Sequence, residues 1–256
     1  MTSPSLLFTS ESVTEGHPDK LCDQVADAVL DACLEQDPMS RVACEVATKT
    51  GFVMLLGEIT THAFVNFDDL ARQVIIDIGY DRAKKGFDGT TCGVLSAIAS
   101  QSPDIDMGVS KSLEAKDGDQ DELDLEGAGD QGMMFGFAST EMDNYMPMPI
   151  EVSHMLLQEL ANNRKEGKLM PYLRPDAKSQ VTIEYDEKNQ PVSIDTIVVS
   201  TQHDEFDTDD ERMRAKIEDD VRKILIPRVI KQLPERIGKL FNEHYKLYVN
   251  PTGKFV

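Results

Sequence analysis

The segment TEGHPDK at residues 14–20 places three side chains suited to phosphate chemistry at the start of a predicted helix. The first N–H groups of a helix have no intrahelical acceptor and carry partial positive charge, so this end of a helix favours anions. His17 and Lys20 would add hydrogen-bond donors, and Asp19 could hold a divalent cation against a phosphate. A capped helix start with solvated charges would have the same sequence, so both interpretations stay open.

A second candidate is Lys178, which stands in RPDAKSQV (174–181) at the mouth of a predicted strand, flanked by Arg174 and Asp176. A lysine there could neutralise charge that develops on a phosphate group. An ordinary exposed lysine is the commoner case. The segment therefore indicates a phosphate contact only in combination with other groups.

Two carboxylates interrupt apolar, β-rich runs, Glu45 in VACEVAT and Glu58 in LLGEITT. A carboxylate that faces the interior from a strand is costly unless it has a partner. Each glutamate therefore either faces solvent or binds a cation or an amine. The remaining histidines have no metal-ligand spacing, and we expect structural roles for them: His62, His154, His203 and His244.

The motif GAGDQG at residues 127–132 fits the G-x-G-x-x-G pattern of dinucleotide-binding turns. That pattern needs a strand before it and a helix after it, so that the pyrophosphate meets the helix N-terminus. Here the acidic residues 117–126 precede it, and the apolar residues 133–140 that follow predict a strand. We therefore disfavour a Rossmann turn and expect a flexible turn, or a glycine-rich turn that a ligand approaches closely with Asp130 facing it.

Residues 101–126 carry nine acidic residues and two lysines without sustained periodicity. Such a stretch inside a compact chain predicts a lid, a binding loop or disorder. Its DGDQDE resembles the start of an EF-hand, but Glu122 stands where glycine is needed and Ala128 where glutamate is needed. An acidic Ca²⁺-binding or interaction protein is therefore disfavoured.

The composition limits the classes of partner. The 256 residues allow one large domain or two of ordinary size, and the net charge of −20 argues against nucleic acids and anionic membranes. No apolar run approaches a membrane span, and the N-terminus shows no signal peptide. The four cysteines contain no C-x-x-C pair, so we expect no zinc site and a reducing cytoplasm: Cys22, Cys33, Cys44 and Cys92.

The predicted elements mix helices with antiparallel hairpins, which defines an α+β fold. The predicted helices are 17–36, 68–79, 149–167 and one that follows the acidic stretch 204–211. The predicted strands are 41–49, 51–61, 90–100 (as a buried strand), 133–140, a hairpin within 178–201, and 245–249. The expected organisation is an N-terminal α+β domain 1–104, an acidic flexible loop 105–126, a central α+β domain 127–248 and a final segment 249–256.

Eight segments occur in the order in which they occur in one enzyme family: LFTSESVTEGHPDK, VACEVATKTG, GEITT, SAIASQSPDI, GAGDQGMMFGFA, LRPDAKSQV, STQH and NPTGKFV. The chain thus resembles S-adenosylmethionine synthase (methionine adenosyltransferase) from Leu7 to its last residue. GAGDQG followed by an aromatic segment is highly specific to that family, although Phe137 stands where tyrosine is common. The family joins the sulfur of methionine to C5′ of ATP and displaces triphosphate, which it hydrolyses to pyrophosphate and phosphate.

The resemblance implies roles at the phosphate end of such a site. His17 would contact the phosphates near the C5′–O bond and assist departure of the leaving group. Asp19 would bind Mg²⁺, of which the family uses two per site. Lys178 would contact the phosphate chain as a second catalytic residue, and Asp176 and Ala177 would line the ATP site.

The resemblance also implies an ATP-contacting pair, Lys254 and Phe255, and a K⁺ ligand, Glu45. Residues 101–126 match the family's gating loop in a longer and more acidic form. An α+β fold of repeated sheets covered by helices is implied, with homodimers or homotetramers whose sites lie between subunits. The residues that look like methionine contacts are Glu58, Gln101 and Asp130.

The chemistry agrees with this assignment. Attack by a neutral thioether creates a sulfonium cation while a polyanion leaves. Such a reaction needs carboxylates at one end of the site and lysine, histidine and Mg²⁺ at the other. A closing loop is expected because water would hydrolyse ATP unproductively.

Two family segments, GGPxGDxGLTGRK and GGGAFSGKD, have no counterpart in this sequence. Residues 249–256 are accordingly expected to begin a C-terminal domain that the chain lacks. By resemblance, those segments supply an aspartate and lysines that hold ATP, methionine and Mg²⁺. A truncated, non-catalytic ATP-binding or regulatory subunit is the alternative, and uncovered apolar surface is expected to lower stability.

Overall fold

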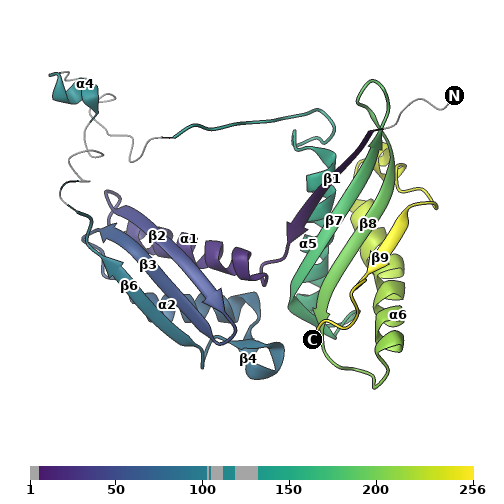
Figure 1. Cartoon of the computed structure of the whole chain (residues 1–256), viewed down its shortest axis with the longest axis horizontal. Helices are drawn as coiled ribbons and strands as arrows, with labels where there is room; N and C mark the ends of the chain where they lie inside the picture. Colours follow the sequence, from purple (N-terminus) through teal and green to yellow (C-terminus); the bar gives the residue numbers. More distant parts are fainter. Residues whose placement is uncertain (1–5, 103, 105–111, 119–131) are drawn as a thin grey trace.

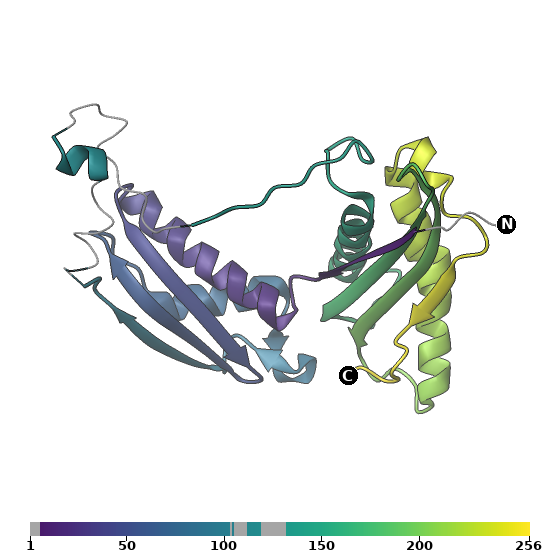
Figure 2. The ribbon, with the colours of Figure 1, turned by 45° about the horizontal axis from the view of Figure 1, so that its top comes forward.

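The computed structural model describes residues 6–102, 104, 112–118 and 132–256. Two units stand side by side, and in each of them helices cover one face of a β-sheet (Figures 1 and 2). The α+β class predicted from hairpins and amphipathic helices is therefore confirmed. The elements of the first unit are α1 (Pro18–Gln36), β2 (Arg41–Lys49), β3 (Phe52–Thr60), α2 (Phe67–Ile78), β4 (Asp81–Arg82), η1 (Ala83–Lys85), β5 (Phe87–Asp88) and β6 (Gly93–Ala99).

The short helix α4 (Leu113–Lys116) lies between the two units in the sequence. The sheet of the second unit is built on a long antiparallel hairpin, and its helical arm is one continuous run with a π-helical turn in the middle. The elements are α5 (Met148–Glu166), β7 (Leu173–Tyr185), β8 (Pro191–His203), α6 (Asp210–Asp220), η2 (Val221–Leu225), α7 (Ile226–Gln232), α8 (Glu235–Gly238) and β9 (Lys246–Val249).

The first unit folds around two helices whose apolar stripes meet one sheet face. Helix α1 has Pro18 in its first turn, where a missing N–H costs nothing, and α2 ends at Gly79 in the left-handed conformation. The sheet order is β2-β3-β6, with β2 antiparallel and β6 parallel to β3. The side chains buried between helices and sheet include Leu21, Val25, Val29, Val53, Leu55 and Ile75.

No element among the described residues covers the opposite face of this sheet. Alternate residues of β2 point there, and they stand beside Leu56 and Glu58 of β3. Strand 90–100 was predicted to be buried, and this is wrong. Strand β6 is an edge strand, and its Leu95 is 55% exposed because no element covers that face.

The second unit repeats the same order of helix, hairpin, helix and parallel strand. Its sheet order is β1-β7-β8-β9, where β1 is the strand Leu6–Val13 and β9 is parallel to β8. Helix α5 and the α6–α7 arm pack on the face that presents Val181 and Ile183 of β7 and Ile197 of β8. The residues between them on β7, including Asp176 and Lys178, therefore point to the uncovered face.

The first strand of the chain lies in the sheet of the second unit. Strand β1 (Leu6–Val13) pairs antiparallel with β7, from Leu6 opposite Tyr185 to Val13 opposite Lys178. Figure 1 shows it running from α1 across to the far sheet. This crossing was absent from the sequence prediction, and it ties the two units together.

The predicted strand 133–140 is also wrong. These residues are extended, but within the described ranges they pair with no other strand, and the side chain of Met134 is 96% exposed. An apolar run becomes a strand only where another strand satisfies its backbone. Of the motif GAGDQG only Gly132 is among the described residues. Gly127, Gly129 and Asp130 lie outside them, as do most of residues 105–126.

Among the described ranges, no helix combines the length and the apolar character that crossing a membrane requires.

The junction between the units leaves no room for a side chain at Gly16. A Cβ there would lie 2.4 Å from the carbonyl carbon of Pro175, which is backbone and cannot swing away. We expect Gly16→Ala to lower the free energy of unfolding by about 2 kcal/mol, as overpacking does. Urea unfolding measures this loss. Gly136→Ala is the control because a Cβ there meets nothing within 4 Å, and equal stability of both variants would contradict the steric account.

Candidate functional site

The helix-start segment of the first unit is fastened to β7 of the second unit through Thr14. The Thr14 N–H donates to the carbonyl of Ala177 at 2.9 Å. Its hydroxyl donates to the carbonyl of Pro175 at 2.7 Å and accepts from the Ala177 N–H at 2.7 Å. Because Thr14 is buried, these bonds are shielded from water. They place the start of α1 directly beside residues 175–178.

Three further contacts close the junction. The Tyr80 hydroxyl donates to the Gly16 carbonyl at 2.7 Å. Arg164 of α5 bonds Glu15 at 2.6 Å and the carbonyl of Ile78 at 2.8 Å. The side-chain amide of Gln202 in β8 donates to the Lys85 carbonyl of the first unit. The N-terminal segment is thus held between both units.

A cavity of roughly 500 Å³ lies at this junction. Backbone and side chains from both units enclose it, with the uncovered face of β7 and β8 as one wall. Its lining is Gly16, Pro18, Leu21, Thr48, Lys49, Thr50, Tyr80, Lys85, Gly86, Phe87, Asp176, Gln202 and Val256.

His17 and Asp19 flank Pro18, which lines this cavity. His17 caps α1, and its Nδ1 accepts the N–H of Asp19 at 3.2 Å. Its side chain is only 11% exposed, whereas that of Asp19 is 89% exposed. The helix start therefore offers a fixed imidazole and a solvated carboxylate.

Asp176 carries a buried acceptor whose hydrogen-bonding capacity is unused within the part of the chain that the structure describes. Its Oδ1 is buried and has no hydrogen-bond partner among the described residues. Burial raises the pKa of this carboxyl, while the nearby charges of His17 and Lys178 pull the pKa back down. Burial and the charge of Asp176 also raise the pKa of the Tyr80 hydroxyl. A buried carboxylate oxygen without a partner is an acceptor prepared for a ligand.

Lys178 and the end of the chain adjoin the same wall. Lys178 is exposed on β7, paired between Val13 of β1 and Ser200 of β8. Lys254 forms ion pairs with Glu205 and Asp210. Lys178 therefore adds positive charge near Asp176, whereas the charge of Lys254 is balanced by its two carboxylate partners.

Phe255 is held by the last residue of β8, His203. The His203 N–H donates to the Phe255 carbonyl at 2.9 Å, and the Phe255 N–H donates to His203 Nε2 at 3.4 Å. The following residue, Val256, lines the cavity. The structural role expected for His203 agrees with these contacts.

The predicted methionine and K⁺ residues lie elsewhere. Glu45 and Glu58 are exposed on the uncovered face of the first sheet, Glu58 opposite Ala99 of β6. Gln101 follows β6 at that same end, and its Oε1 is a second buried acceptor that has no hydrogen-bond partner within the described part of the chain. The hairpin turn that lines the cavity is at the other end of β3, about 20 Å away at the usual rise of a strand.

Asp130 lies outside the described residues, so the structure does not place it. Within the described ranges, no three His, Cys, Asp or Glu side chains gather as a metal-binding cluster. All four cysteines are free thiols.

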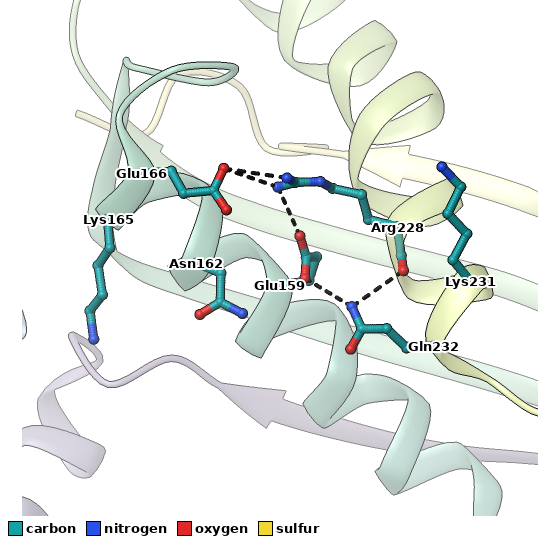
Figure 3. A pocket seen from close by; sticks show the side chains of 7 residues that line it. All are labelled: Glu159, Asn162, Lys165, Glu166, Arg228, Lys231 and Gln232. Carbon is teal, nitrogen blue, oxygen red and sulfur yellow. Dashed lines mark hydrogen bonds and ion pairs between the residues drawn. The ribbon is translucent and has the colours of Figure 1, made fainter.

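A second hollow, of roughly 610 Å³, lies between α5 and α7 (Figure 3). Both of its carboxylates are paired within it: Arg228 contacts Glu159 at 3.0 Å and Glu166 at 3.3 Å, and Gln232 donates to Glu159 at 2.9 Å. This hollow is a polar helix contact and contains none of the predicted site residues.

Sequence reasoning assigned a site role to only one residue of the cavity wall, Asp176, and missed among others Tyr80, Lys85, Phe87 and Gln202. The first three of these missed residues sit in the short β4–β5 excursion, which has no periodic signal. Gln202 belongs to STQH, a segment used for the resemblance but not assigned a role.

Comparison with known families matches two consecutive regions. Residues 5–103 match "S-adenosylmethionine synthetase, N-terminal domain", and residues 125–255 match "S-adenosylmethionine synthetase, central domain". The two matches include both units and the junction between them.

Individual relatives agree with these matches. The chain is 54% identical over 250 residues to the S-adenosylmethionine synthase of Christiangramia forsetii, covering 98% of this chain and 58% of that protein. Identity to the synthase of Phocaeicola vulgatus is also 54%, with 98% and 59% covered. For the Clostridium tetani synthase the values are 54%, 98% and 61%. The chain spans about three fifths of the length of the curated relatives it matches.

The raised pKa of Asp176 predicts a pH-dependent stability difference. The folded state binds the carboxyl proton more tightly than the unfolded state, so this group makes stability fall as pH rises through its folded pKa. Asp176→Asn removes that loss. We expect the variant to be more stable than the parent chain at about pH 8 and the advantage to shrink toward about pH 5.

Thermal unfolding at both pH values measures this difference. Asp31→Asn is the control because Asp31 is exposed on α1. A variant of Asp176 whose stability relative to the parent does not change with pH would show that burial does not perturb this carboxyl.

Proposed function

Because this chain belongs to the S-adenosylmethionine synthetase family, we propose that it takes part in forming S-adenosylmethionine from ATP and L-methionine, followed by hydrolysis of the displaced triphosphate to pyrophosphate and phosphate. The observation that carries the proposal is that Asp176 lines the cavity and that the charges of His17 and Lys178 act on its carboxyl, although about 160 residues separate His17 from the other two. The free thiols and the composition support a cytoplasmic protein.

In this proposal the phosphate chain lies at the rim of the cavity. His17 caps α1 by accepting the N–H of Asp19 at Nδ1, so its Nε2 is left to donate toward an oxygen near the C5′–O bond. Lys178 adds a charge-assisted contact, which strengthens as negative charge accumulates on the leaving triphosphate. Lys254 and Phe255 complete the ATP contacts, with Ala177 held in place by Thr14.

The described residues fit a role for Mg²⁺. This ion keeps several waters and binds through one or two carboxylates plus substrate phosphates, so the exposed carboxylate of Asp19 suffices as a protein anchor. A pair of such ions would neutralise charge on the triphosphate. Glu45, exposed on its strand, would supply a ligand to K⁺.

The arrangement also supports a site shared between two copies of the chain. Reaction requires the methionine sulfur within about 3.5 Å of C5′. Glu58 and Gln101 lie at the end of the first sheet that is remote from the cavity. A partner whose uncovered sheet face approaches this cavity would bring its own Glu58 and Gln101 to the ATP, with Asp130 joining the same end. We therefore propose a homodimer or homotetramer.

Single-turnover mixing of the chain with ATP, methionine, Mg²⁺ and K⁺ tests the function. We expect S-adenosylmethionine and triphosphate to form together. Lys178→Met and His17→Asn should each slow product formation by about 100-fold or more, because each removes stabilisation of the leaving group. Lys188→Met is the matched control, since Lys188 lies exposed in the turn between β7 and β8.

The outcomes separate the two candidate roles. ATP binding without product would favour the non-catalytic subunit, a chain that binds ATP and works beside a complete enzyme. Failure to bind ATP, together with absence of product, would overturn both.

Mixing two inactive variants tests the shared site. Lys178→Met damages the ATP side and Glu58→Gln the methionine side. If each site takes these residues from different copies, random pairing leaves one unaltered site in every mixed dimer, and activity should return to about a quarter of the parent value. Turnover after mixing measures this recovery. If turnover does not recover after mixing, Lys178 and Glu58 of one site belong to the same copy.

A further inference from the structure

Gln202 is a buried side chain in the cavity wall to which the proposed reaction assigns no role. It lies near the end of β8, where it is 8% exposed. Its Nε2 donates to the carbonyl of Lys85 in the first unit at 3.3 Å. Its Oε1 is fully buried and has no hydrogen-bond partner among the described residues.

The orientation of this amide is fixed by its surroundings. The Lys85 carbonyl can only accept, so the nitrogen of Gln202 must face it and the oxygen must face away. The carbonyl itself is anchored, because Lys85 Nζ bonds the Gly79 carbonyl at 2.8 Å and Asp81 at 2.9 Å. In Gln202, a residue of the cavity wall, the atom left to bind a further partner is therefore an acceptor and not a donor.

A second acceptor lies beside it. Ala177 of β7 stands opposite Thr201 of β8, and the register of the pair shifts between Ala177 and Leu173. Asp176 and Gln202, which follow that last regular pair, are both in the cavity lining. Asp176 Oδ1 is likewise buried without a partner. Two neighbouring acceptors on adjacent strands match two neighbouring hydroxyl donors.

Triphosphate oxygens are acceptors and cannot satisfy these atoms. The ribose of ATP offers a vicinal pair of hydroxyls, and it follows directly after the phosphates that His17 and Lys178 would hold. We propose that Gln202 is a specificity-determining residue that accepts a hydrogen bond from a ribose hydroxyl of the nucleotide. This inference rests on the proposed function and names the part of the substrate that the second sheet reads.

Calorimetric titration of the chain in Mg²⁺ tests the inference, with ATP, its 2′-deoxy and 3′-deoxy analogues, inosine triphosphate and inorganic triphosphate as probes. Gln202→Met keeps the length of the side chain and removes the acceptor. We expect it to weaken ATP binding about tenfold, the effect of one lost hydrogen bond to a buried group. Gln180→Met, on the exposed part of β7, should change nothing.

The analogues identify the hydroxyl. One deoxy analogue should bind the parent chain about tenfold more weakly than ATP, and this difference should vanish in Gln202→Met, because the bond is already absent there. Inorganic triphosphate has no ribose, so both chains should bind it equally. A merely structural role for Gln202 would weaken triphosphate binding as well, and a misfolded variant would do the same.

Three results would overturn the inference. Equal affinity of Gln202→Met and the parent for ATP would contradict the proposed hydrogen bond and would leave the proposed function intact. If the parent chain binds inosine triphosphate more weakly than ATP but binds both deoxy analogues as tightly as ATP, and Gln202→Met binds ATP and inosine triphosphate equally, Gln202 contacts the amine of the base. If Gln202→Met does not fold, the parent chain alone decides, since full affinity for both deoxy analogues contradicts a ribose contact. A parent that binds neither ATP nor triphosphate would instead sink the proposed function.

Discussion

The hydrogen bonds of Thr14 to residues 175 and 177 are the constraint on which the rest of the structure depends. They join the end of the crossing strand β1 to the strand that carries the cavity wall. Because Gly16 then packs against Pro175 with no space for a side chain, the start of α1 can occupy only one position relative to β7. The imidazole of His17 and the carboxylate of Asp176 are neighbours for this reason, and neither unit alone contains the arrangement.

Each unit leaves one face of its sheet uncovered, and the candidate site residues lie on these faces or at their ends. On the second sheet the face carries Asp176 and Lys178, and on the first it carries Glu45 and Glu58. Buried acceptors without partners reduce stability, since their desolvation is not repaid by a hydrogen bond. A functional site tolerates that penalty because the ligand supplies the missing donors. Stability and ligand recognition therefore oppose each other in this cavity.

Sequence reasoning recovered the elements whose signal is local. The helices α1, α2 and α5 and the hairpin β2–β3 follow from periodicity, capping and glycine positions within a few residues. It failed where a distant partner decides the outcome: β1 becomes a strand because β7 is available, whereas residues 133–140 stay unpaired and β6 is left exposed at an edge. The resemblance identified His17, Asp176 and Lys178, but only the fold revealed Gln202, because its significance depends on Lys85 in the other unit.

The crossing of β1 has a consequence for how the protein is made. A ribosome releases the chain from its N-terminus, and residues 6–13 emerge long before the residues with which they pair, the last of which is Tyr185. During that interval an apolar strand with Leu6, Leu7 and Phe8 has no native partner, and contacts of such long sequence separation form slowly. Nascent chains would be most vulnerable to misassociation during this period, and a chaperone that shields the first few residues would protect the whole fold.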